Sequence, residues 1–245
     1  MPTRLDCVVL HANDAPRVAA FWGKALGWTV TEERGGWHLV APYDTPAWAD
    51  GGPPPLLVLQ VPDRKDGKNR VHLDLVSASE QAQQATVERL LGLGATPTDI
   101  GQGEVAWAVL ADPEGNELCV LDPRDRYAAS PTVAAVVLDA ADPAGLAAFW
   151  SEATGWPVVE AQPRYAALRH PDRCGTWLEL VAVDAGKTRK HRVHLDLAPR
   201  AGDDHAVEVA RLVQAGARHV DGQARAGWTV LADPEGNEVC VLPPR

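Results

Sequence analysis

The sequence Arg-Val-His-Leu-Asp-Leu occurs twice and carries side chains suited to chemistry. The first copy places His72 two residues before Asp74, and the second places His194 two residues before Asp196. On a strand, such a pair shares one face, opposite the apolar residues beside it. A histidine oriented by a carboxylate is suited to bind a metal ion or to transfer a proton. The alternative is a polar strand face that is hydrogen-bonded to neighbouring strands.

A second repeated motif, Leu-Ala-Asp-Pro-Glu-Gly-Asn-Glu-x-Cys-Val-Leu, contains Cys119 in one copy and Cys240 in the other. Each cysteine follows a glutamate by two residues, so the thiol and the carboxylate share a strand face. A thiolate there could bind a soft metal such as zinc, or act as a nucleophile activated by histidine. The alternative is a small buried thiol that fills space, the common fate of an isolated cysteine. Cys7 and Cys174 lack partners in the repeat and need no special role.

His191 and His194 form a His-x-x-His pattern, which on a helix would suggest a zinc site. On a strand the two side chains point to opposite faces, so we do not expect them to share a ligand. His11 in the first half corresponds to Asp139 in the second, and both residue types can bind metals. Both also suit a strand end that faces solvent or the mouth of a binding site.

The chain has nine tryptophans, against three tyrosines and two phenylalanines. Indole rings suit a wall that contacts planar or apolar ligands. Five of them lie on expected strands or in a proline-rich loop, and we predict them to contact a ligand: Trp37, Trp48, Trp107, Trp177 and Trp228. The alternative for each is ordinary packing against a sheet.

Hydrophobic periodicity predicts two units of one pattern, strand, helix and three strands, in each half of the chain. In the first unit we expect strands near residues 5–11, 28–31, 37–41 and 56–61, and a helix that Asp14 caps and Gly27 ends. In the second we expect strands near 70–76, 95–100, 105–110 and 117–121, and a helix over 79–91. Asp-Pro-Glu-Gly-Asn is predicted to form the last hairpin turn of each half. The loop 44–55 is either a lid or a tolerated insertion.

A third motif, Val-Val-Leu-x-Ala-x-Asp followed by Ala-Ala-Phe-Trp, lies near the start of each half and ends at Trp22 and Trp150. The three repeated motifs occur in the same order in both halves, which indicates duplication. The segment from Asp122 to Pro131 is rich in charge and proline and separates the copies. We therefore predict a first domain over residues 1–122, a linker over 123–131 and a second domain over 132–245.

Paired units of this pattern, with an opening Val-Val-Leu-His, a central His-Leu-Asp-Leu and a closing Asp-Pro-Glu-Gly-Asn-Glu, resemble the vicinal oxygen chelate superfamily. This is the group of the glyoxalases, bleomycin-resistance proteins and extradiol dioxygenases. The resemblance implies an α+β fold of four βαβββ modules in two tandem glyoxalase-like domains, whose mixed sheets curl into cups. The superfamily includes metal-dependent lyases, isomerases, thiol transferases and dioxygenases, and metal-free proteins that sequester antibiotics. Fold is therefore a safer inference than function.

The resemblance also implies ligand positions on the first and last strands of each unit. In the first half these are His11, a residue near 57–60, His72 and Cys119, and in the second half Asp139, Glu179, His194 and Cys240. Metal-dependent members usually have glutamate at the last position, where this chain has cysteine twice. Units in this superfamily can pair with a unit of the other half. Asp139 and Glu179 therefore face either His194 and Cys240 of their own half or His72 and Cys119 of the first half.

Composition excludes several classes of function. With 33 Asp and Glu against 23 Lys and Arg, the 245-residue chain has a formal charge of -10, which disfavours nucleic acid and anionic membranes as partners. The sequence has no signal-peptide pattern and no apolar run of membrane length. Its four cysteines are far apart, which predicts a reduced, cytoplasmic protein.

We therefore expect a protein that binds or sequesters an aromatic or apolar small molecule without a metal ion. The alternative is a glyoxalase-type lyase or isomerase that uses Zn, Ni, Mn or Fe, with His72 or His194 and the carboxylates of Asp139 and Glu179. A third interpretation is a regulatory or assembly module with decayed sites. The chain is expected to be a monomer with pseudo-dimeric halves or a homodimer.

Overall fold

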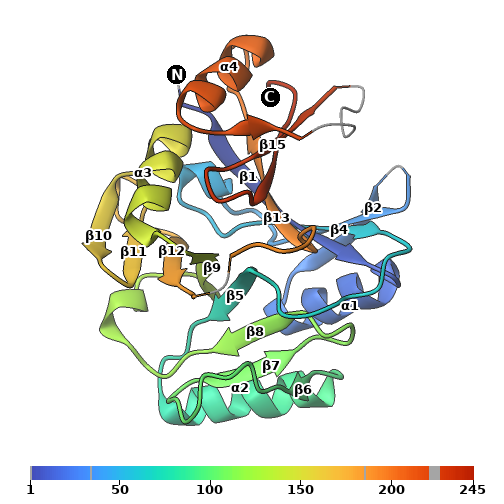
Figure 1. The fold of residues 1–245 in the computed structure, drawn as a ribbon. Helices are drawn as coiled ribbons and strands as arrows, with labels where there is room; N and C mark the ends of the chain where they lie inside the picture. The colour runs from blue at the N-terminus through green and yellow to red at the C-terminus, as the bar shows by residue number, and fades with distance from the viewer. Residues whose placement is uncertain (1, 34, 185, 221–226) are drawn as a thin grey trace.

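The computed structural model describes residues 2–33, 35–184, 186–220 and 227–245. Its elements follow the predicted order of strand, helix and three strands four times (Figure 1). The first module contains β1 (Arg4–Ala12), α1 (Ala15–Leu26), β2 (Thr29–Glu33), β3 (Trp37–Ala41) and β4 (Leu56–Gln60), and the second contains β5 (Val71–Leu75), α2 (Glu80–Gly92), β6 (Thr96–Pro97), β7 (Ala108–Ala111) and β8 (Glu117–Val120). The third contains β9 (Val133–Ala140), α3 (Pro143–Thr154), β10 (Val158–Gln162), β11 (Tyr165–Leu168) and β12 (Trp177–Ala182), and the fourth contains β13 (Val193–Ala198), α4 (His205–Gln214), β14 (Arg218–His219), β15 (Thr229–Ala232) and β16 (Glu238–Val241). Two short 3₁₀ helices, η1 (Trp48–Asp50) and η2 (Asp125–Tyr127), lie in the connections.

The helices begin and end where their capping residues dictate. The carboxylate of Asp14 accepts a hydrogen bond from the backbone N–H of Arg17 at 3.1 Å, and Gly27 ends α1 with φ of 71°. Asp142 and Gly155 repeat both roles at the ends of α3. None of the helices in the described part of the chain is long and apolar enough to cross a membrane.

Two mixed eight-stranded sheets form, and each takes one module from either half of the chain. Sheet A has the order β14-β15-β16-β13-β1-β4-β3-β2, and sheet B has the order β10-β11-β12-β9-β5-β8-β7-β6. At the centre of sheet A, β1 runs antiparallel to β13, and at the centre of sheet B, β5 runs antiparallel to β9. The first and fourth modules therefore share one sheet, and the second and third share the other.

Strand parity sorts the side chains as the sequence predicts. Val71, Leu73 and Leu75 of β5 belong to the main hydrophobic core, which also contains the buried faces of the helices. His72 and Asp74 lie on the opposite face of the same strand. Helix α1 packs on β2, β3 and β4, and α3 packs on β10, β11 and β12, so one face of each sheet remains for a binding site.

The Asp-Pro-Glu-Gly-Asn segments form tight turns, as predicted. In the first, the backbone N–H of Asp112 donates to the carbonyl of Asn116 at 2.8 Å, and Gly115 has φ of 84°. The carboxylate of Asp112 also accepts from the backbone N–H groups of Glu114 and Asn116. This conformation favours glycine at the position of positive φ.

The loop 44–55 is anchored against the second half of the chain. Trp48 in η1 is fully buried, and its ring meets that of Trp156 edge-on with centroids 6.3 Å apart. Gly51 packs so closely against Cys174 and Gly175 that a Cβ at position 51 would collide with the thiol. Of the two alternatives for this loop, the structure favours an insertion that joins the halves.

Candidate functional site

Sheet A carries a cavity of about 680 Å³ on the face that holds His11 and His194. We call this side of the sheet cup A, and the corresponding side of sheet B cup B. The apolar wall of cup A contains Leu57 and Leu59 of β4 and the indoles of Trp37 and Trp228, whose ring centroids lie 6.2 Å apart. The volume falls within the range of about 300–1,000 Å³ that is typical of small-molecule sites.

A triad of His194, Asp196 and Cys240 lies in the wall of cup A. Nε2 of His194 is 3.4 Å from Oδ1 of Asp196 and 3.4 Å from Sγ of Cys240. One potential ligand atom from each residue lies within 4.8 Å of the other two. The ring of His11 meets that of His194 with centroids 5.3 Å apart. Two strands position the triad, because Asp196 of β13 pairs directly with Cys240 of β16.

Cys7 adds a second thiol to this cluster, which sequence reasoning missed. Cys7 pairs with Asp196 across β1 and β13, and its Sγ lies 3.9 Å from Oδ2 of Asp196. Burial raises the pKa of the Cys7 thiol, and the Asp196 carboxylate raises it further. The same two causes raise the pKa of the Cys240 thiol. The signal in the sequence is parity, since residues 7, 9 and 11 share one strand face.

His191 lies in the wall of cup A together with His194. Parity predicts opposite faces for these two histidines, but His191 precedes the first residue of β13, so the rule does not apply to it. His191 is buried, and neither of its ring nitrogens has a hydrogen-bond partner among the described residues. Burial lowers the pKa of its imidazole to about 4, against the opposing effect of the nearby Glu238 carboxylate.

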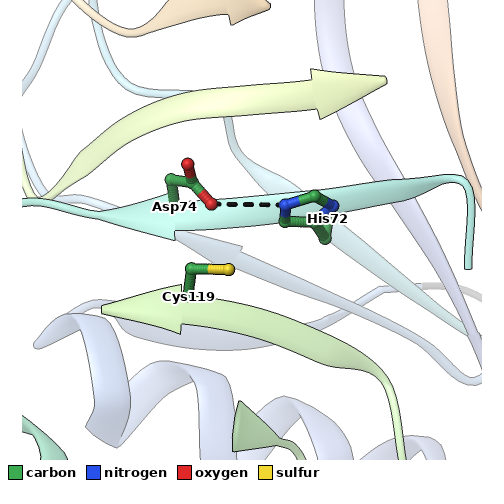
Figure 2. Close-up of side chains that lie close together, drawn as sticks. All are labelled: His72, Asp74 and Cys119. Carbon is green, nitrogen blue, oxygen red and sulfur yellow. Dashed lines mark ion pairs between the residues drawn. The ribbon is translucent and has the colours of Figure 1, made fainter. Parts of the chain in front are cut away.

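Cup B contains the matching triad of His72, Asp74 and Cys119. Figure 2 shows His72 and Asp74 side by side on β5 and Cys119 on the neighbouring strand β8. Nε2 of His72 lies 3.4 Å from Oδ1 of Asp74. Nδ1 of His72 and Oδ1 of Asp74 are buried without a hydrogen bond among the described residues. Burial raises the pKa of the Cys119 thiol, and Asp74 raises it further.

The segment predicted as a linker fills cup B. Tyr127 of η2 is 2% exposed and packs in a cluster with Cys119 and Trp177. The Arg126 guanidinium lies 4.6 Å from the ring centroid of Trp177 and 5.2 Å from that of Tyr165. No comparable segment covers cup A within the described part of the chain, where the cavity is open to a ligand.

Asp139 and Glu179 lie in sheet B, so the structure does not join them with His194 and Cys240. The phenol of Tyr127 donates to Oε1 of Glu179 at 2.8 Å, and burial raises the pKa of that carboxyl. Asp139 forms an ion pair with Lys68 at 2.5 Å. Of the two pairings that the resemblance left open, the structure adopts the one across the halves.

The five tryptophans that were predicted to contact a ligand divide into three groups. Trp37 and Trp228 line the cavity of cup A. Trp177 packs against the linker in cup B, and Trp107 lies beneath the guanidinium of Arg124 at 5.3 Å. Trp48 lies in the core of the molecule, and its indole has no exposed surface to offer a ligand.

Comparison with known proteins agrees with this architecture. Glyoxalase I from Zea mays superposes with a TM-score of 0.67, 16% identity and coverage of 98% of this chain and 92% of the maize chain. A putative dioxygenase from Bacillus subtilis gives a TM-score of 0.63, 13% identity and coverage of 99% and 86%. At these identities the likeness concerns the fold alone. No curated protein matches the sequence.

The sequence itself matches one protein family in both halves. The family described as "Glyoxalase-like domain" matches residues 7–121 and again residues 135–242. These matches span most of the chain, and each ends at the last residue of the closing motif. The chain therefore belongs to the glyoxalase-like domain family and carries two copies of its domain.

Proposed function

We propose that this protein binds one small molecule with an apolar or aromatic body in cup A, without requiring a metal ion, and that cup B is a closed copy of the same site. One observation carries the proposal: the two cups have matching triads, but they differ in what lies against the triad. The cavity of about 680 Å³ in cup A is lined by its whole triad, whereas the hollow of about 510 Å³ at Trp107 and Val109, beside cup B, is lined by no member of the triad there. The equivalent space of cup B is taken by Arg126 and Tyr127.

The chemistry of cup A suits a ligand with two kinds of surface. Leu57, Leu59 and the indoles of Trp37 and Trp228 offer apolar area and edge or face contacts to a ring. His11 and His194, on the adjacent strands β1 and β13, supply hydrogen-bonding groups that would fix the orientation of a ligand. At the position where cup B has Glu179, cup A has Leu57, so its wall lacks that carboxylate and favours an apolar ligand surface.

A neutral aromatic probe tests the proposal. We expect 1-naphthol to bind one site per chain in isothermal titration calorimetry, and Trp228→Ala to weaken this binding by about tenfold, since a lost ring contact removes roughly 1–2 kcal/mol. Trp107→Ala is the matched control, because it removes an indole beside cup B. Equal affinity in the wild-type protein and the Trp228→Ala variant, or loss in the control alone, would contradict the assignment to cup A.

The triad of cup A supports a second candidate, a metal-dependent lyase or isomerase. His194, Asp196 and Cys240 form a donor set that fits a divalent ion such as zinc, and Oδ1 of Asp196 is buried without a hydrogen bond. An ion bound there would polarise a substrate oxygen as a Lewis acid. The raised pKa of the Cys240 thiol means that binding must displace a proton, so metal affinity should rise with pH.

Metal content separates the two candidates without an activity assay. The protein is incubated in turn with Zn²⁺, Ni²⁺, Mn²⁺ and Fe²⁺, desalted and analysed by mass spectrometry, together with the variants His194→Ala and His72→Ala. One equivalent that is lost only in His194→Ala supports the metalloenzyme, and one lost only in His72→Ala places the ion in cup B. No stoichiometric metal under any of the four conditions supports the metal-independent protein.

A further inference from the structure

A second cavity, of about 440 Å³, lies beside cup A between the two halves of the chain. It is formed by residues of 61–70 and of 183–184 and 186–192, in the segments that connect the two modules within each half. Eight lysine and arginine side chains line it among the described residues, against three aspartates. We call this cavity the basic cleft. It gathers about a third of the chain's 23 basic residues in a protein whose formal charge is -10.

Six of the eight basic side chains already have acidic partners. Lys65 contacts Glu117 at 2.8 Å, for example, and its counterpart Lys187 contacts Glu238 at 2.5 Å. Arg64 and Lys190 form no ion pair within the described part of the chain, and both are exposed at the cleft. The paired residues shape the cleft, and these two cations provide charge that a ligand can neutralise.

The basic cleft and cup A share a wall. His11, Val61, Lys190 and His191 line both cavities. The positive charge of Lys190 also acts on cup A, where it opposes the increase in the pKa of the Cys240 thiol. His191 is 7% exposed. Its Nδ1 lies 3.6 Å from Oε2 of Glu238, and its Nε2 has no hydrogen-bond partner among the described residues, so the shared wall has one unused polar atom.

We propose that the basic cleft binds an anionic group of the same ligand whose apolar body lies in cup A, so that the ligand is an aromatic or alicyclic phosphate ester or carboxylic acid. This inference rests on the proposed function of cup A and specifies its ligand class. An anion meets repulsion from the net charge of the protein, and the two cations of the cleft that have no ion pair among the described residues oppose that repulsion locally. Lys190 and Arg64 neutralise the anion, and His191 offers a hydrogen bond from the shared wall.

Three probes with the same ring test the inference: 1-naphthyl phosphate, 1-naphthoate and neutral 1-naphthol. We expect at least one of the anions to bind about tenfold more tightly than 1-naphthol in calorimetry, with an affinity that falls as NaCl is raised. The stronger of the two anions identifies the acid group. Equal affinity of all three probes would overturn the inference and leave the proposed function intact.

Variants locate the anion site. Arg64→Gln combined with Lys190→Gln should reduce the preference for the anion to less than about twofold. Arg64→Gln alone changes a residue that lines only the basic cleft, so it should reduce the preference and leave 1-naphthol binding unchanged. Arg64 and Lys190 are exposed and free of ion pairs with the described residues, so the fold does not depend on them. Arg200→Gln removes an exposed arginine outside the cleft and should leave the preference unchanged.

Two further outcomes separate this inference from the proposed function. If Trp228→Ala leaves the affinity for 1-naphthyl phosphate unchanged but the double variant abolishes it, the cleft binds phosphate alone, and the joint site is wrong. Competition by inorganic phosphate at millimolar concentration would then be as strong as competition by 1-naphthyl phosphate. If the preference for the anion survives in the double variant, Arg64 and Lys190 do not hold it, and the inference fails.

Discussion

Arg70 and Glu235 connect the two halves of the chain directly. A guanidinium nitrogen of Arg70 lies 3.0 Å from Oε2 of Glu235, and the same carboxylate accepts hydrogen bonds from the backbone N–H groups of Ala141 and Asp142, where α3 begins. Arg192 and Glu114 repeat the arrangement at the start of α1. The arginine of Arg-Val-His-Leu-Asp-Leu in each half thus binds the glutamate of Asp-Pro-Glu-Gly-Asn in the other.

Removing the charge of Glu235 should destabilise the whole protein. We expect Glu235→Gln to lower the free energy of unfolding by about 3 kcal/mol, because it leaves the largely buried guanidinium of Arg70 without its counter-charge. Chemical denaturation followed by tryptophan fluorescence measures the change. Asp184→Asn is the control, since its pairing with Arg164 is solvent-exposed and should be nearly neutral. A similar loss in both variants would contradict a special role for the Arg70–Glu235 contact.

The sequence predicted the modules well because their signals are local. The strand over 37–41 has the same ends in the structure, and Asp14 and Gly27 bound α1 as expected. The strand expected over 95–100 shrinks to Thr96–Pro97, and its counterpart β14, which contains no proline, is equally short. Local patterns therefore fix element type and capping, but they do not fix strand length.

The site was less predictable because it depends on contacts between distant segments. Parity alone predicts that His72 and Asp74 share a polar strand face. It does not predict which other module pairs with that strand, because the repeated modules offer similar strand edges. Tyr127 lies in a segment whose proline and charge indicate a linker, and nothing local shows that its ring is buried at Glu179. The basic cleft needs two charged segments far apart in sequence to meet.

Removing the hydroxyl of Tyr127 tests the closure of cup B by the linker. We expect Tyr127→Phe to lower the free energy of unfolding by about 1–3 kcal/mol, because the buried carboxyl of Glu179 loses a hydrogen-bond donor. Thermal unfolding measures the loss, and 1-naphthol affinity should stay at the wild-type value. Tyr43→Phe is the matched control, since this tyrosine is 87% exposed. A drop in 1-naphthol affinity in Tyr127→Phe would mean that the two cups are not independent.

The four cysteines should differ in their reactivity towards iodoacetamide. Burial raises the pKa of the thiols of Cys7, Cys119 and Cys240, so they are protonated near neutral pH and react slowly. Cys174 and Cys240 are both half-buried, but Sγ of Cys174 lies 3.7 Å from Nδ1 of His170, whereas the thiol of Cys240 is beside the Asp196 carboxylate. We expect Cys174 to be alkylated more than about tenfold faster than the other three, and Cys174→Ser to remove the fast phase in mass spectrometry. Fast modification of Cys240 would contradict a raised pKa of its thiol beside the Asp196 carboxylate.

His191 should make the protein less stable in acid. Its folded-state pKa of about 4 is lower than the ordinary value of 6.5, because burial outweighs the Glu238 carboxylate, and Lys187, Arg70 and His194 add to the decrease. Between pH 6.5 and 4 the unfolded chain therefore binds a proton that the folded protein excludes, and the free energy of unfolding falls by up to about 1.4 kcal/mol per pH unit. Above pH 6.5 the imidazole is neutral in both states and has no effect.

The variant His191→Gln isolates this contribution. It retains a polar side chain but cannot be protonated, so its melting temperature should fall less than that of the wild-type protein between pH 6.5 and 4. His219→Gln removes an exposed imidazole on β14 and should follow the wild-type profile. Since all carboxylates are common to the three proteins, their acid response cancels in the comparison. Parallel profiles for His191→Gln and the wild-type protein would show that His191 is protonated without cost in the folded state, and that the wall between cup A and the basic cleft carries an additional positive charge in acid.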